Sequence, residues 1–144
     1  MVRKIEGILT GYAQKLTLVD PIFRLLTSLI FIIGGLGHFF RPEEMLPRME
    51  ESPWRDTIHA IGDPLLLLWL SGAAFVVAGI GLALGWMTRL SALILFVTLI
   101  PVTITIHFAP GHMGPLFKNV AILGALFFLF VRGPGSYALD NRKG

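Results

Sequence analysis

The sequence predicts an all-α membrane protein, an antiparallel bundle of four transmembrane helices preceded by an N-terminal interfacial amphipathic helix. The first observation is composition, since 54% of the 144 residues are hydrophobic and only 15% are charged, which is too apolar for an ordinary soluble domain. The second is that four runs contain no Asp, Glu, Lys or Arg: residues 25–40, 65–88, 90–117 and 119–131. About 20 apolar residues cross the hydrocarbon core, and the two shorter runs reach that length when flanking basic side chains extend to the headgroups.

Residues 1–21 are predicted to form the interfacial helix. Apolar side chains recur there at helical spacing, and charged or amide side chains lie off that stripe. The apolar positions are Ile5, Ile8, Leu9, Tyr12, Ala13 and Leu16. Gly7 and Gly11 weaken the helix, so a frayed tail is the alternative. We expect no secretory signal, because a charged segment comes first.

The first span is predicted from Ile22 to Phe40, with Asp20 and Pro21 signalling its start and Pro42 its end. Glycines near its end would let another helix approach closely. The connection from Arg41 to Asp63 is polar and acidic, and short surface helices are expected through Met45, Leu46, Met49 and Trp54.

The second span is predicted from Pro64 to Trp86, and Gly81 and Gly85 belong to a repeat of small residues suited to close packing. The short turn MTRL then requires the third span, Ser91 to Phe108, to lie antiparallel and adjacent. Pro101 should kink this span and free the carbonyl of Val97, with neighbouring threonines satisfying backbone groups. The fourth span follows a turn between Pro110 and Pro115 and ends at Arg132.

Basic residues predict the orientation. One side of the membrane receives eight of them, Arg3, Lys4, Lys15, Arg24, Arg89, Arg132, Arg142 and Lys143, and the other receives four, Arg41, Arg48, Arg55 and Lys118. The positive-inside rule therefore places both termini in the cytoplasm of a bacterial-type inner membrane. The net charge of +3 lies at the ends of the apolar runs, so we expect no nucleic-acid partner.

All four histidines fall on the outer side under this topology, and His38 and His107 each end an apolar run. One interpretation is interfacial rings whose nitrogens bond to water or backbone. A second is a quinone site, in which His38 and His107 donate hydrogen bonds and Asn119 orients the ring. A metal site and a b-type haem are less favoured, because the strong ligand spacings are missing. The chain has no cysteine, so redox chemistry would belong to a bound cofactor or a partner.

Arg24, Arg89 and Asp140 lie together at the predicted cytoplasmic boundary, where a partly desolvated arginine–carboxylate contact would be structural. The alternative is that these arginines reach lipid phosphates. No nucleophile pattern and no phosphate-binding glycine loop is present.

The segments RLLTSLIFIIGGLGHFF, GLALGWMTRLSALILF, TITIHF and GPGSYALD together resemble the DoxX family over residues 22–140, leaving 141–144 as a cytoplasmic tail. The resemblance implies a four-span bundle with a possible quinone-linked role in thiosulfate or sulfur metabolism. It matches Arg24, Arg89, His107 and Asp140 to recurring family residues, and His38 to a position where many relatives have lysine. Relatives often carry a glutamate where this chain has Phe75, which weakens the case for proton-coupled chemistry.

We therefore predict a membrane subunit of a redox complex with a ligand site near the outer leaflet, formed by His38, His107 and Asn119. The alternative is a noncatalytic interaction or assembly subunit, whose small-residue faces at Gly81 and Gly85 pack against another membrane protein. Expected partners are the lipid bilayer and a membrane or redox protein, with a second copy of the chain as an alternative. A small-solute transporter is disfavoured, because no internal repeat and no buried charge is present.

Overall fold

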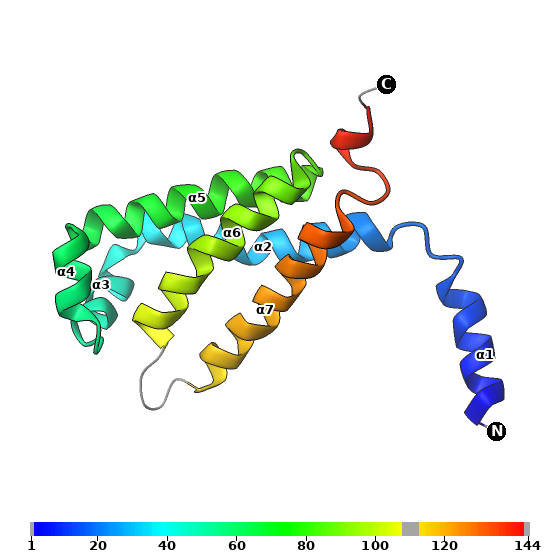
Figure 1. The fold of residues 1–144 in the computed structure, drawn as a ribbon, viewed down its shortest axis with the longest axis horizontal. Helices are drawn as coiled ribbons and strands as arrows, with labels where there is room; N and C mark the ends of the chain where they lie inside the picture. The colour runs from blue at the N-terminus through cyan, green and yellow to red at the C-terminus, as the bar shows by residue number, and fades with distance from the viewer. Residues whose placement is uncertain (1, 108–112, 143–144) are drawn as a thin grey trace.

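The computed structural model describes residues 2–107 and 113–142, without the side chains of His107 and Met113. Its described part is helical, with no strand (Figure 1). The elements are α1 (Val2–Ala13), α2 (Val19–Phe40), α3 (Pro42–Glu50), α4 (Arg55–Ile61), α5 (Pro64–Leu84), α6 (Thr88–Val102), the π-helix η1 (Thr103–His107), α7 (Met113–Arg132) and the 3₁₀-helix η2 (Leu139–Arg142).

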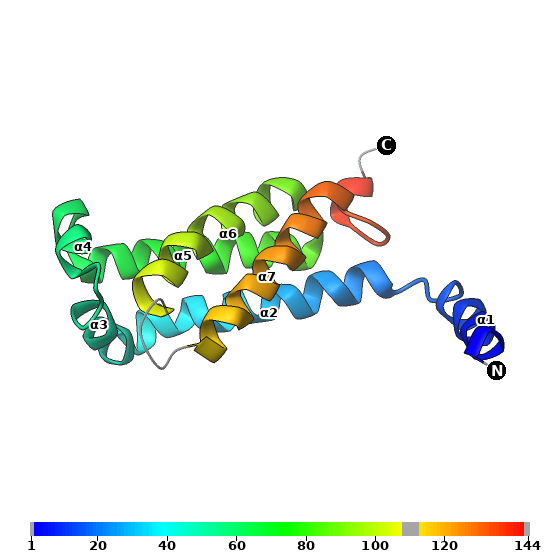
Figure 2. The ribbon, with the colours of Figure 1, turned by 60° about the horizontal axis from the view of Figure 1, so that its bottom comes forward.

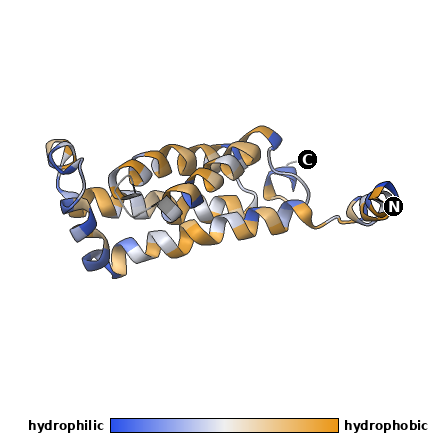
Figure 3. Ribbon diagram, turned by 90° about the horizontal axis from the view of Figure 1, so that it is seen from below, coloured by the Kyte–Doolittle hydropathy of each residue, from blue (hydrophilic) through white to orange (hydrophobic). Residues whose placement is uncertain are grey.

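Four helices are long and apolar enough to cross a membrane, which confirms the predicted spans. They cover Val19–Phe40, Pro64–Leu84, Thr88–Ile106 and Gly114–Arg132. Figure 3 shows that the bundle is largely hydrophobic along its length and that hydrophilic residues gather at its ends. Apolar side chains cover its outer surface, including Leu26, Val77 and Phe127, as expected for helices that face lipid.

Two helix starts differ from the prediction. The helix α2 begins at Val19, so Asp20 lies in its first turn and does not cap it. The turn between α5 and α6 is shorter than MTRL, because Gly85 ends α5 in the left-handed conformation (φ 66°) and Thr88 is already helical. Glycine adopts this conformation without a Cβ clash, so the chain reverses between Gly85 and Met87.

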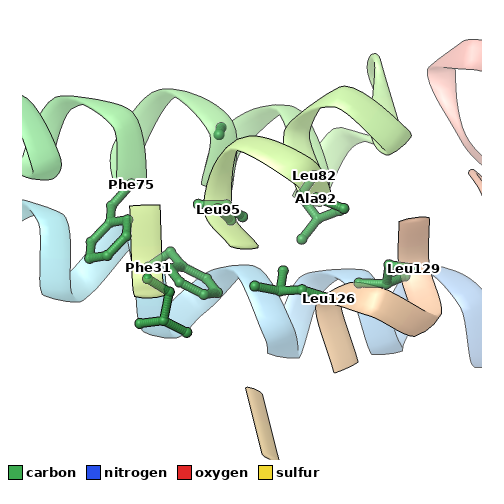
Figure 4. Packing of buried hydrophobic residues seen from close by; sticks show 9 residues of the cluster. Phe31, Phe75, Leu82, Ala92, Leu95, Leu126 and Leu129 are labelled. Atoms are coloured by element: carbon green, nitrogen blue, oxygen red, sulfur yellow. The ribbon is translucent and has the colours of Figure 1, made fainter. Parts of the chain in front are cut away.

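The helices α2 and α5 lie side by side along most of their length (Figures 1 and 2). A Cβ on Gly35 would lie 2.7 Å from the carbonyl oxygen of Gly72, and a Cβ on Gly72 would lie 2.9 Å from that of Gly35. The close approach predicted for the α2 glycines is thus confirmed at Gly35. Next to this contact, the core combines residues of α2, α5, α6 and α7, among them Phe31, Phe75, Leu95 and Leu126 (Figure 4).

The α6 helix changes to π-helical geometry two residues after Pro101. Proline removes a backbone donor, and threonine hydroxyls satisfy neighbouring carbonyls as predicted. The hydroxyl of Thr103 donates to the carbonyl of Leu99 (2.7 Å), and that of Thr105 donates to the carbonyl of Pro101 (2.8 Å). The satisfied carbonyls are therefore those of Leu99 and Pro101, whereas the prediction concerned Val97.

The loop from Arg41 to Asp63 contains the expected short helices, α3 and α4. Their apolar side chains Met49 and Ile58 are buried against Leu68 of α5 and Ile106 of η1. These two helices therefore close one end of the bundle. At the opposite end, α1 extends away from the bundle with every described residue exposed (Figure 1).

Candidate functional site

His38 lies in the last turn of α2 and is only 5% exposed. Its Nδ1 atom is 3.0 Å from the hydroxyl oxygen of Ser71 on α5. The ring also packs beside that of Phe75, with 5.6 Å between the ring centroids. The close contact of α2 with α5 at Gly35 and Gly72 brings these side chains together. His38 is thus held inside the bundle, against Ser71 and Phe75 of α5.

A cavity of about 290 Å³ opens beside this pair, between α2, α5 and α6 and beneath α3 and α4. Its polar side chains are those of His38, Ser71, Thr98 and Thr105. The apolar lining consists of Met49, Ile58, Ile61, Leu67, Leu68, Pro101, Val102 and Ile106. Concave, mostly apolar sites with a few convergent polar groups are typical of small-molecule sites, and this volume is near the lower end of their usual range.

Asn119 lies on α7 and is buried, but it does not line this cavity. Its side-chain amide donates a hydrogen bond to the hydroxyl of Thr103 (3.0 Å). That hydroxyl in turn donates to the carbonyl of Leu99. Asn119 therefore connects α7 to the π-helical turn whose residues Thr105 and Ile106 line the cavity. Since its contact is with Thr103, Asn119 supports the helical turn that lines the cavity and does not face the cavity itself.

Two of the histidines fall wholly or partly outside the described residues. The backbone of His107 ends η1, next to the cavity-lining Ile106. The side chain of His107 and the whole of His112 are not among the described residues. The fourth histidine, His59, lies on α4, where its Nε2 is 2.8 Å from a carboxylate oxygen of Glu50. Arg55 also donates to Glu50 (2.6 Å). The hydrogen bonds from His59 and Arg55 lower the pKa of the Glu50 carboxyl.

Arg24 anchors the opposite end of the bundle. It is 1% exposed, and its guanidinium donates to the backbone carbonyls of Pro134, Ser136 and Tyr137. The chain after α7 thus folds back over the start of α2, where Asp20 accepts hydrogen bonds from Arg132 (2.8 Å) and Ser136. The arginine–carboxylate pair at this boundary is therefore Arg132 with Asp20. Nothing in the sequence pattern singled out that pair, because its members lie 112 positions apart.

Asp140 and Arg89 also hold the C-terminal segment. The carboxylate of Asp140 accepts hydrogen bonds from the backbone N–H groups of Met87 (2.7 Å) and Thr88 (2.9 Å), and from the Thr88 hydroxyl (2.9 Å). It therefore caps the N-terminus of α6. Arg89 donates to the carbonyl of Val131 (3.5 Å). The structural interpretation of these residues agrees with the geometry, although their contacts are mainly with backbone groups.

Gly81 and Gly85 face the interior of this protein. A Cβ on Gly81 would lie 2.6 Å from the Ser91 hydroxyl, and one on Gly85 would lie 2.8 Å from the Cα atom of Ala138. Both glycines are buried by the chain itself. The expectation that they form a contact face for another protein is therefore wrong, because the turn into α6 and the returning C-terminal segment already cover them.

Ser71 is the site residue that the sequence analysis did not identify. A signal was available, because this serine is the only hydroxyl residue between Pro64 and Trp86, in a run that contains no charge. Polar side chains inside a transmembrane segment usually have a specific partner or function. The partner could not be read from the sequence, since it depends on how α2 and α5 align.

The fold and the cavity together define a four-span helical membrane protein with an apolar, histidine-containing cavity near one end of the bundle. A comparison with protein families matches the DoxX family model to residues 19–108, more than half of the chain. The chain belongs to the DoxX family. No curated protein and no solved structure gives a match to the chain.

Proposed function

We propose that this protein is the integral membrane subunit of a quinone-linked redox complex, of the type that serves thiosulfate or sulfur metabolism, and that the cavity beside His38 binds the quinone ring. The observation that carries the proposal is a buried histidine in a mostly apolar cavity at one end of the bundle. A quinone has the matching chemistry, because its ring carries two polar oxygens and its isoprenoid tail is apolar.

The cavity residues supply binding and orientation. Leu68, Val102 and Ile106 exclude water from the ring, and His38 with Thr105 provides polar contacts for its oxygens. The volume of about 290 Å³ accommodates a ring with little beyond it, so the tail extends between the helices into lipid. The bound ring supplies two-electron redox chemistry. Because the chain lacks cysteine, thiol and thiolate-held iron–sulfur chemistry must come from a partner protein.

In this proposal the cavity lies near the outer leaflet of a bacterial-type inner membrane, and both termini are cytoplasmic. The excess of basic residues at the other end of the bundle supports this orientation. The exposed helix α1 then lies on the inner surface of the membrane. We keep His107 as the second ring contact expected from the sequence, and Asn119 contributes by fixing η1 through Thr103.

The second candidate function is an assembly subunit that packs against another membrane protein or a second copy of the chain. Gly34, Gly37 and Gly124 favour it, because nothing lies within 4 Å of a Cβ built on any of them. Small residues on a lipid-facing surface allow close helix packing. Under this function, large side chains at Gly34 and Gly37 would abolish copurification of the partner, and His38 would be replaceable.

The test is purification in mild detergent, followed by mass spectrometry of the extracted lipids. Wild-type protein should retain quinone near one molecule per chain, and His38→Ala should retain at least tenfold less while its circular dichroism spectrum still shows a folded helical bundle. His59→Ala is the matched control, because this exposed histidine lies outside the cavity. Equal quinone content in wild type and His38→Ala would refute the proposed site.

A further inference from the structure

The hydroxyl of Ser71 is placed where it can set which nitrogen of His38 carries the proton. Its oxygen lies 2.8 Å from the carbonyl oxygen of Leu68 and 3.0 Å from Nδ1 of His38. A serine hydroxyl has a single hydrogen to donate, and a carbonyl oxygen can only accept. When Ser71 donates to Leu68, the contact with His38 requires that Nδ1 carry a hydrogen and donate it to Ser71.

The surroundings of His38 favour the neutral ring. The side chain is almost fully buried, and the residues that line the cavity include no carboxylate. The ring beside it is that of Phe75. Burying an unpaired imidazolium in such surroundings would carry a large desolvation cost. A neutral ring with its proton on Nδ1 leaves Nε2 as a hydrogen-bond acceptor, and in the described part of the chain the side-chain hydrogen bond of His38 is made by Nδ1.

Thr105 is a second acceptor in the same cavity wall. Its hydroxyl hydrogen is directed to the carbonyl of Pro101 (2.8 Å). The lone pairs of its oxygen therefore remain for a ligand. His38 and Thr105 thus present lone pairs from two different helices and have no hydrogen left to offer, and Thr98 is the remaining cavity residue whose hydroxyl can donate.

We propose that this cavity selects the reduced, hydroxyl-bearing form of the ring, a hydroquinone, over the oxidised quinone, with a ring hydroxyl donating to Nε2 of His38. Ser71 is the positioning residue, because it holds the proton on Nδ1. This inference rests on the proposed quinone-type ligand. It gives His38 an acceptor role in place of the donor role that the sequence predicted, since a quinone carbonyl facing the Nε2 lone pair would have no donor.

The selectivity has a measurable redox consequence. Binding that favours the reduced form raises the reduction potential of the bound couple. A tenfold preference corresponds to about 30 mV for a two-electron couple. The bound ring then accepts electrons from a partner more readily than the free ring in the bilayer does.

The experiment compares two ligands that share one tail, decyl-hydroquinone and decyl-benzoquinone, by anaerobic titration calorimetry with the full chain in detergent. The expected result is at least tenfold tighter binding of the hydroquinone. Ser71→Ala should reduce the preference to less than threefold, and Ser71→Thr should restore it. Equal affinities, or tighter binding of the quinone, would overturn the inference and leave the proposed ligand class intact. If neither ring binds, both the inference and the proposed function are wrong.

A second measurement does not depend on a ligand. Nitrogen NMR of protein labelled with ¹⁵N-histidine, assigned by comparison with His38→Ala, reports which ring nitrogen carries the proton. We expect the Nδ1-protonated form in wild type and its partial loss in Ser71→Ala. A wild-type ring protonated on Nε2 would overturn the inference even where the hydroquinone binds.

Discussion

At the scale of single residues, Asp140 closes the end of the bundle remote from the cavity. The turn before α6 has Met87 in the left-handed conformation (φ 46°), and that residue provides no side-chain cap. The carboxylate that accepts the free N–H groups instead comes from a residue more than 50 positions later in the chain. The C-terminal segment therefore contributes to the start of a transmembrane helix.

We expect Asp140→Ala to lower the free energy of unfolding by about 1–2 kcal/mol, because the cap of α6 is lost. Asp140→Asn should retain part of the stabilisation by the cap, since an amide oxygen still accepts a hydrogen bond. Denaturant unfolding in detergent, followed by circular dichroism, measures the change. Leu139→Ala is the control on the same turn. An Asp140→Ala variant as stable as wild type would show that the cap is dispensable.

The sequence was sufficient to mark individual residues as candidates, but it did not predict their partners. His38 was identified because a histidine that ends an apolar run is a local signal. Arg24 was identified as structural, but its partners, the carbonyls of Pro134, Ser136 and Tyr137, could not be, because every residue offers a carbonyl. The contact of Asn119 with Thr103 could not be predicted for a related reason, since it depends on the register between α7 and η1.

At the scale of elements, the α2–α5 contact gives a matched pair of glycines. Gly35→Ala should destabilise the protein by about 1–3 kcal/mol, because the new Cβ would lie 2.7 Å from the Gly72 carbonyl oxygen. Gly34→Ala, one residue earlier, should be neutral or slightly stabilising, because it meets open space and alanine favours helix. Thermal unfolding in detergent measures both. If the two variants behave alike, the helices do not cross at Gly35.

The α3–α4 unit should respond to pH through Glu50. Its pKa is lowered by the hydrogen bonds with His59 and Arg55, so its stabilising contribution is present above the unfolded-state pKa and is lost as the pH falls through the folded-state value. Near neutral pH, amides of α4 should exchange faster in Glu50→Gln than in wild type. This difference should vanish at a pH below the pKa of Glu50. Comparing the two proteins at the same pH removes the intrinsic pH dependence of amide exchange. A difference in exchange rate that stays the same at every pH would contradict the stabilising role assigned to ionised Glu50.

The helices were more predictable than their contacts. Each span follows from a charge-free run, which is a property of consecutive residues and needs no tertiary information. The π-helical turn was not predicted, although Pro101 marked the place where the helix changes. The small-residue repeat at Gly81 and Gly85 correctly indicated close packing, but the sequence could not tell an internal partner from an external one, and the partners proved to be Ser91 and Ala138.

At the scale of the whole molecule, the two ends of the bundle are closed by different kinds of interaction. One end is closed by α3 and α4 over an apolar cavity. The other is held by charged and backbone groups, with Arg24, Asp20 and Asp140 joining the C-terminal segment to the helices. A cavity at one end and a hydrogen-bonded C-terminal segment at the other are consistent with the proposed ligand-binding subunit.

The orientation of these two ends in the membrane can be tested directly, because the chain contains no cysteine and any introduced thiol reports without background. We expect Glu51→Cys, exposed between α3 and α4, to react with a membrane-impermeant maleimide in intact cells. Gly11→Cys on α1 should react only after permeabilisation, because the excess of basic residues predicts a cytoplasmic location for that end. Full labelling of both variants in permeabilised cells is the control. The reverse pattern in intact cells would invert the topology and place the His38 cavity near the inner leaflet.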